Sequence, residues 1–233
     1  MDPHYGETWV YESLVGAIPG LELSDRAALT LQFVVFEALV VAVAALYDLW
    51  DAVPAATAAV VVAVVGSWLM LTFSRTVREI DIPDGYRTLL FGSSLELALS
   101  VLAFVLFATY LFVVDPRAAP SLLTTLLGPE PPALAVVLLL LVVWDVIYRI
   151  GACWWATVAG FWRAVHYGFD EETTRRLTRL DGLNVAFAAV QVVLVPFVLG
   201  HPLLVVALVG HLLAVVGVAS ASMLLQRRRV EAV

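Results

Sequence analysis

The sequence predicts an all-α fold, a polytopic integral membrane bundle of six transmembrane helices. Hydrophobic residues make up 62% of the 233 residues and charged residues only 14%, whereas soluble domains are about 45–50% apolar. The chain also contains successive apolar runs near the length of about 20 residues that crosses a hydrocarbon core. A water-soluble domain of this size could not bury so much apolar surface, so lipid must solvate much of it.

Each of the first three apolar runs has a boundary signal. Ser24, with Asp25 after it, can cap the N-terminus of the first helix, because a serine hydroxyl accepts a hydrogen bond from a free backbone amide. Pro54 suits the first turn of the second helix. Asp115 and Pro116 close the third run. The predicted spans are residues 29–50, 54–73 and 88–114.

The fourth run, residues 133–165, is too long for one simple crossing. At about 1.5 Å per residue it would reach roughly 50 Å as a helix. It is either one long helix that projects into the cytoplasm or two short spans broken at Gly151. Each half would have only about 15 residues, below the usual minimum of about 17. We therefore predict a single crossing.

The last two spans are predicted at residues 184–199 and 203–225, joined by a turn at Gly200-His201-Pro202. They complete a membrane domain over residues 29–226. Before them, residues 170–180 carry acidic side chains first and arginines later, a pattern that we interpret as a short surface helix.

Charge predicts the topology. With six spans and both termini inside, every arginine except Arg117 and Arg149 lies on the cytoplasmic side, in agreement with the positive-inside rule. We expect an N-in, C-in protein of the cell membrane whose arginine-rich loops meet anionic lipid headgroups. Residues 1–28 would form a cytoplasmic segment with either an interfacial helix or an ordered tail at residues 7–18. Residues 227–233 would form a basic cytoplasmic tail.

Composition excludes several classes of protein. Cys153 is the only cysteine, so one chain cannot form an internal disulfide or a thiolate metal cluster. All 13 basic residues are arginine, and 20 acidic residues give a net charge of −7. This usage resembles that of salt-loving archaea, and it argues against nucleic acid as a partner. The acidic N-terminus lacks the basic region of a secretory signal peptide, so the first span is expected to stay in the mature protein.

Two segments align without gaps when the sequence is shifted by 97 residues. A duplicated helix–loop–helix would explain the alignment, as parallel repeats occur in some transporters. The alternative is chance similarity of apolar helices, with each Asp-Gly explained locally by aspartate capping the helix that follows. The shift places Thr76, Arg78, Asp84 and Gly85 on Thr173, Arg175, Asp181 and Gly182, and Asp48 on Asp145.

Asp145 and Arg149 are the first candidate site residues. A charge at mid-bilayer costs about 2.5–3.5 kcal/mol on insertion scales. Four residues apart on one helix, these two side chains share a face and can pair, which offsets much of that cost. The pair either lines a polar cavity that binds an ion or charged substrate, or is structural, with Arg149 reaching toward the headgroups. Tyr148 could supply a hydroxyl to either arrangement.

Glu37 and Glu96 lie about two turns inside the predicted cytoplasmic ends of their helices. At matching depths they could face one another, or one could reach Arg149. A protonatable carboxyl at that depth is what a proton-coupled carrier needs. The alternative is that both are neutral and hydrogen-bonded to nearby serines, namely Ser93, Ser94 or Ser100.

Gln191, at the middle of the fifth span, is the last candidate. With Pro196 five residues later, it either borders a cavity with exposed carbonyls or joins two helices by a hydrogen bond.

The sequence lacks an HExxH motif, a P-loop, Gly-x-Ser-x-Gly and metal-ligand spacing. We therefore expect no enzyme activity, no cofactor and no metal. The leading hypothesis is a small transporter or channel-like permease whose polar path is lined by the candidate residues. The alternative is a non-catalytic membrane scaffold or accessory subunit, working with a membrane partner or as a homo-oligomer.

Overall fold

The computed structural model describes residue 9 and residues 24–117 and 121–231. Within these ranges the chain is helical, and six segments are long and apolar enough to cross a membrane. The all-α prediction and the six long apolar helices are therefore confirmed. The elements are α2 (Asp25–Tyr47), η1 (Trp50–Ala52), α3 (Val53–Arg78), α4 (Asp84–Arg87), η2 (Thr88–Gly92), α5 (Leu95–Thr109), η3 (Tyr110–Val114), η4 (Asp115–Arg117), α6 (Leu122–Leu127), α7 (Ala133–His166), α8 (Glu171–Gln191), η5 (Val192–Val198) and α9 (Pro202–Glu231).

Local capping explains where several helices begin. The Ser24 hydroxyl accepts from the amide of Ala27 at 3.3 Å and caps α2, as predicted. Proline lies in the first turn of α3. Asp170 caps α8, because its carboxylate accepts from the amide of Thr173 at 2.9 Å. Ser24 and Asp170 thus satisfy amides that have no partner within their own helix.

Helix α7 is the central element and is unbroken over 34 residues. It packs against α3, α5 and α9. Gly151 is not a hinge. A Cβ atom at this position would clash with the side chain of Ser100, so the glycine lets α5 approach α7 closely.

The third span is interrupted, which the sequence did not predict. Helical structure begins at Asp84 and reaches Arg117, but it breaks between η2 and α5, where Ser94 has a φ of 52°. The two flanking segments, η2 and η3, are π-helical turns. The predicted single helix at residues 88–114 is thus a chain of short segments around α5.

Helix α8 corrects two expectations. The predicted surface helix at residues 170–180 and the start of the fifth span form one helix from Glu171 to Gln191. Asp181 therefore lies inside a helix and does not cap one, whereas Asp84 begins a short helix after a loop. The aligned segments have different local structures, which argues against a duplicated helix–loop–helix. After Gln191 the helix tightens into η5, where Pro196 cannot donate an α-helical hydrogen bond.

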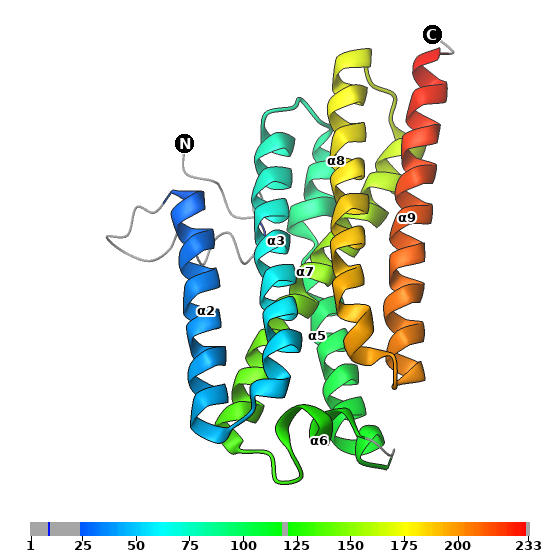
Figure 1. Cartoon of the computed structure of the whole chain (residues 1–233). Coiled ribbons are helices and arrows are strands. Elements are labelled where there is room, and N and C mark those ends of the chain that lie inside the picture. The colour runs from blue at the N-terminus through cyan, green and yellow to red at the C-terminus, as the bar shows by residue number, and fades with distance from the viewer. Residues whose placement is uncertain (1–8, 10–23, 118–120, 232–233) are drawn as a thin grey trace.

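The six long segments run up and down, so that the two ends of the bundle differ (Figure 1). The N-terminus of α2 and α8 and the C-terminus of α3, α7 and α9 lie at one end, which we call the arginine-rich end. Helix α6 lies at the opposite end, the α6 end. The segment η4, which ends at Arg117, contacts α6 and so belongs to this end. The interfacial helix expected at residues 7–18 falls outside the described residues.

Candidate functional site

The Asp145–Arg149 pair forms as predicted and is part of a larger network. Arg149 Nη2 lies 2.7 Å from Asp145 Oδ1. Gln32 of α2 donates to the other carboxylate oxygen of Asp145 at 2.8 Å. Ser67 of α3 donates to the amide oxygen of Gln32, also at 2.8 Å. This Asp145 network therefore connects α2, α3 and α7.

Close packing holds the Arg149 side chain inside the bundle. It is fully buried, and its Nη1 lies 3.9 Å from the sulfur of Met70. Gly66 of α3 makes room for it, because an added Cβ would stand 2.7 Å from Arg149 Cδ and 2.9 Å from the Phe187 ring. In this structure Arg149 is therefore enclosed by the bundle and does not extend toward its surface.

A second network surrounds Arg163 near the arginine-rich end. Arg163 Nη2 pairs with Asp181 of α8 at 2.8 Å, and Nη1 donates to the Tyr86 hydroxyl of α4 at 3.0 Å. Ser222 of α9 donates to the same oxygen of Asp181 at 2.8 Å. With its amide oxygen turned toward Arg163, Gln226 of α9 accepts from Nη2 at 2.5 Å. This Arg163 network connects α4, α7, α8 and α9.

The Arg163 network is more deeply buried than the Asp145 network. The Arg163 and Asp181 side chains are 0% and 2% exposed, and the guanidinium lies 5.1 Å from the centre of the Tyr86 ring. Gly160 allows the approach, since an added Cβ would stand 2.9 Å from Asp181 Oδ1. Ser222 also donates to the Gly160 carbonyl at 3.2 Å.

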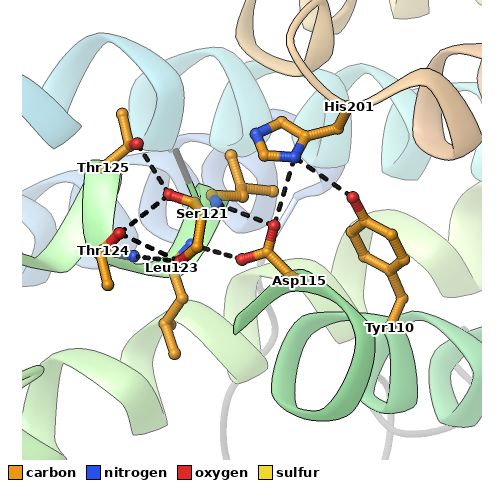
Figure 2. A network of polar contacts seen from close by, with 8 residues as sticks. Tyr110, Asp115, Ser121, Leu123, Thr124, Thr125 and His201 are labelled. Carbon is orange, nitrogen blue, oxygen red and sulfur yellow. Dashed lines mark hydrogen bonds and ion pairs between the residues drawn. The ribbon is translucent and has the colours of Figure 1, made fainter. Parts of the chain in front are cut away.

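A third network lies at the α6 end (Figure 2). The Asp115 carboxylate accepts from the backbone amides of Leu122 and Leu123, at 2.9 and 3.0 Å, and so covers the start of α6. His201 Nδ1 lies 3.2 Å from Asp115 Oδ1 and 3.2 Å from the Tyr110 hydroxyl. The predicted turn at His201 is thus tied to the end of the third span.

The other candidate residues lie in separate contacts. Glu37 accepts from Thr57 of α3 at 2.5 Å. Glu96 is buried at the start of α5, and Ser100 donates to its backbone carbonyl at 2.5 Å. The Tyr148 ring packs on Trp144, with centroids 6.1 Å apart. Gln191 is fully buried, and neither polar atom of its amide has a hydrogen-bond partner among the described residues.

A cavity of about 770 Å³ opens in the half of the bundle nearer α6. Its walls come from α2, α3, α5, α6, α7, η5 and α9 and are almost wholly apolar. Thr109, Tyr110 and His211 are the polar residues on this lining, which includes none of the predicted site residues. Within the described part of the chain, no three histidine, cysteine, aspartate or glutamate side chains gather to hold a metal ion.

Sequence reasoning missed Gln32, Ser67 and the whole Arg163 network. Arg163 and Asp181 are 18 residues apart and on different helices, so no helical spacing connects them. One signal for the Arg163 network was present in the sequence. Ser222 is a polar residue within the sixth apolar run, and such a residue needs a hydrogen-bond partner inside the bundle.

These features define a multi-pass α-helical membrane protein with buried polar networks and a large apolar cavity. The chain belongs to a family of unknown function (DUF7530), whose match covers residues 4–222. No curated protein and no solved structure matches the sequence.

Proposed function

We propose that this chain is a non-catalytic membrane scaffold or accessory subunit. One observation carries the proposal. The charged side chains of the Asp145 and Arg163 networks are paired and bonded to neighbouring helices, Asp145 to Gln32 of α2 and Arg163 to Asp181 of α8, and they are not part of the cavity lining. Buried pairs of this kind fix which helices pack together and in which register.

A polar transport path would need charged or hydrogen-bonding groups along a hydrated cavity. Here the large cavity is apolar. The Arg163–Asp181 pair is closed by partners from α4 and α9. Both facts support a role in which polar groups stabilise the bundle.

The arginine-rich end supports an interaction surface. Arg175 and Arg176 are paired with Glu171 and Glu172 one turn earlier, at 2.9 and 2.8 Å. Arg227 and Arg228 are exposed at the end of α9. We propose that this end faces the cytoplasm of a cell membrane, N-in and C-in, where such arginines meet anionic headgroups or an acidic partner.

Vesicle tethering tests the interaction surface. The purified chain in nanodiscs of neutral lipid should bind vesicles that contain phosphatidylglycerol, and binding should weaken as salt rises. The double variant Arg227→Gln/Arg228→Gln should bind severalfold more weakly. Arg117→Gln, at the other end of the bundle, is the matched control. Equal losses from both variants, or binding that salt does not change, would contradict the proposal.

Sidedness has its own test. Single cysteines introduced at Arg117 and Arg175 should label from opposite sides of the membrane with an impermeant thiol reagent. Cys153 is buried and provides a low background. Labelling of both positions from the same side of the membrane would contradict the proposed topology.

A small proton-coupled permease is the second candidate, favoured by Glu37 and Glu96. In each carboxyl group, Oε2 is buried and has no hydrogen-bond partner among the described residues. Vesicles loaded with a pH-sensitive dye distinguish the two functions. The scaffold proposal expects the same proton flux as in empty vesicles, whereas a permease requires a flux that Glu37→Gln or Glu96→Gln reduces.

A further inference from the structure

The cavity is long and narrow in the direction of the membrane normal. Its lining on α7 extends from Ala135 to Ile150, which is about 22 Å at about 1.5 Å per residue. This length is a large part of the hydrocarbon thickness of about 30 Å. Its volume of about 770 Å³ lies in the range of about 300–1,000 Å³ that is typical of ligand sites. The space therefore suits a chain-shaped molecule.

The cavity is open toward the side of the bundle. Leu106 of α5 and Leu203 of α9 both belong to its lining, yet they are 61% and 59% exposed. These exposed leucines lie inside the membrane-spanning segments. A molecule that enters between α5 and α9 would therefore come from the bilayer and not from water.

One polar side chain on the lining, His211, has a ring nitrogen without a hydrogen-bond partner among the described residues. The Tyr110 hydroxyl is bonded to His201, and Thr109 donates to the Val105 carbonyl at 2.8 Å. No hydrogen bond of this kind holds the His211 imidazole: the ring belongs to the lining, and its Nε2 has no hydrogen-bond partner among the described residues. The ring of Trp154 lies against the His211 imidazole, with centroids 6.0 Å apart, and this contact holds the ring in place.

His211 lies at the inner end of the cavity. Along α9 the lining begins at Leu203 and ends at His211, and along α7 the lining ends at Ile150, one turn before Trp154. Helix α6 closes the opposite end with Leu122, Leu126 and Leu127. A ligand whose polar group reaches His211 would therefore place its hydrocarbon chain along the apolar walls.

From this geometry we propose that the cavity binds a long-chain lipid that carries a hydroxyl or carbonyl group. The chain enters between α5 and α9, and its oxygen forms a hydrogen bond with the His211 imidazole. A buried polar atom without a partner costs free energy, so this bond favours such a lipid over a plain hydrocarbon. The inference goes beyond the proposed scaffold function and does not depend on it.

Photolabelling tests the proposal on the full chain in nanodiscs. The probes are a long-chain fatty alcohol with a diazirine in its alkyl chain and the matching alkane diazirine. The alcohol should label cavity-wall peptides of α5, α7 and α9 saturably, and unlabelled alcohol should compete. The alkane should need about three- to tenfold more probe, the difference expected for one hydrogen bond.

Variants separate the cavity from the annular lipid. His211→Leu should abolish the advantage of the alcohol over the alkane, and His211→Gln, whose amide can still form a hydrogen bond, should retain part of it. Ala207→Phe should block both probes by filling the cavity, and Ala103→Phe should do the same from the α5 wall. Leu213→Phe, on an exposed face of α9, is the matched control and should change neither.

Three outcomes would overturn the inference. One is labelling that never saturates and spreads over outward faces such as that of Leu213, which would mean annular lipid only. Another is an alcohol-to-alkane ratio that His211→Leu leaves unchanged. The third is full labelling of both phenylalanine variants, provided that each still elutes as a folded species.

Discussion

Arg149 and Arg163 lie on the same helix and both are fully buried, yet they are neutralised in different ways. Arg149 pairs with Asp145 of its own helix, whose side chain is 16% exposed. Arg163 pairs with Asp181 of another helix, whose side chain is 2% exposed. A same-helix pair can form before the bundle assembles, whereas the Arg163 pair forms only when α7 and α8 pack together.

The Asp145–Arg149 pair depends on residue spacing within one helix, whereas the Arg163–Asp181 pair depends on the packing of two helices. A pair at four-residue spacing reduces the cost of placing one helix in the membrane. A pair between helices determines helix neighbours, because removing either partner leaves an uncompensated buried charge. The Arg163 network should therefore matter more for stability, and the Asp145 network less.

The largest effect is expected from Asp181→Ala. The substitution leaves Arg163 charged and buried, which costs about 3–5 kcal/mol for a buried pair. Thermal unfolding can be followed with a thiol-reactive dye, because Cys153 is buried and is the only cysteine. Glu171→Ala removes a carboxylate from an exposed pair on the same helix and should shift the midpoint very little. Similar shifts for both variants would contradict the ranking.

The glycines that make room for the two arginines test packing. Gly66→Ala and Gly160→Ala each place a methyl group within 3 Å of network atoms, and such overpacking costs about 1–3 kcal/mol. Gly217→Ala is the matched control, since an added Cβ there has no atom within 4 Å. Alanine also favours helices by about 1 kcal/mol over glycine. Gly217→Ala should therefore be neutral or stabilising in the same dye assay.

The features predicted correctly from the sequence are those that depend on residues close together in the chain. Six apolar segments, the Ser24 cap and the Asp145–Arg149 pair all follow from length, capping chemistry or four-residue spacing. Composition and charge could not reveal that Asp181 lies within a helix. That aspartate was interpreted as a cap because Asp-Gly often precedes a helix, and only its partner on α7 explains its position.

The contacts of the candidate site residues also depend on helix packing, so the sequence alone could not predict them. The similar depths of Glu37 and Glu96 in their spans suggested that they could face one another, or that one could reach Arg149. Depth along a helix, however, does not determine the direction in which a side chain points. Glu37 contacts α3, and Glu96 begins a separate helix after the break at Ser94. The cavity could not be predicted at all, because alanine, valine and leucine line cavities and fill cores equally well.

Replacing whole pairs sharpens the comparison of the two arginines. Asp145→Leu/Arg149→Met removes both charges and leaves Gln32 its bond with Ser67, so unfolding stability should stay within about 1 kcal/mol of the original. Asp181→Leu/Arg163→Met also removes Arg163 as the hydrogen-bond partner of Tyr86 and Gln226. Each lost partner costs about 1–3 kcal/mol in a buried site. Because Gln32 also loses Asp145 in the first double variant, the second loses about one partner more. It should be less stable than the first by about 1–3 kcal/mol, and equal stability would remove the distinction.

The smallest effect is expected outside the membrane, at the N-cap of α8. Asp170 accepts hydrogen bonds from the backbone amide and hydroxyl of Thr173, at 2.9 and 2.8 Å. These bonds, the backbone amide first, hold the pKa of the Asp170 carboxyl below its ordinary value. Because the folded-state pKa is lowered, the carboxylate stabilises the helix above its unfolded pKa of about 3.9 and loses that effect as pH falls through the folded value.

Unfolding midpoints measured by intrinsic tryptophan fluorescence across pH check this sign. Asp170→Ala should lower the midpoint slightly near neutral pH, and the difference from the original chain should shrink below about pH 4. Asp170→Asn keeps a good cap without a titrating group, so its midpoint should stay close to the original near neutral pH. The acid-side change that belongs to Asp170 should be absent from it. A difference between Asp170→Ala and the original chain that stays constant from neutral to acidic pH would show that the carboxylate charge has no part in capping α8.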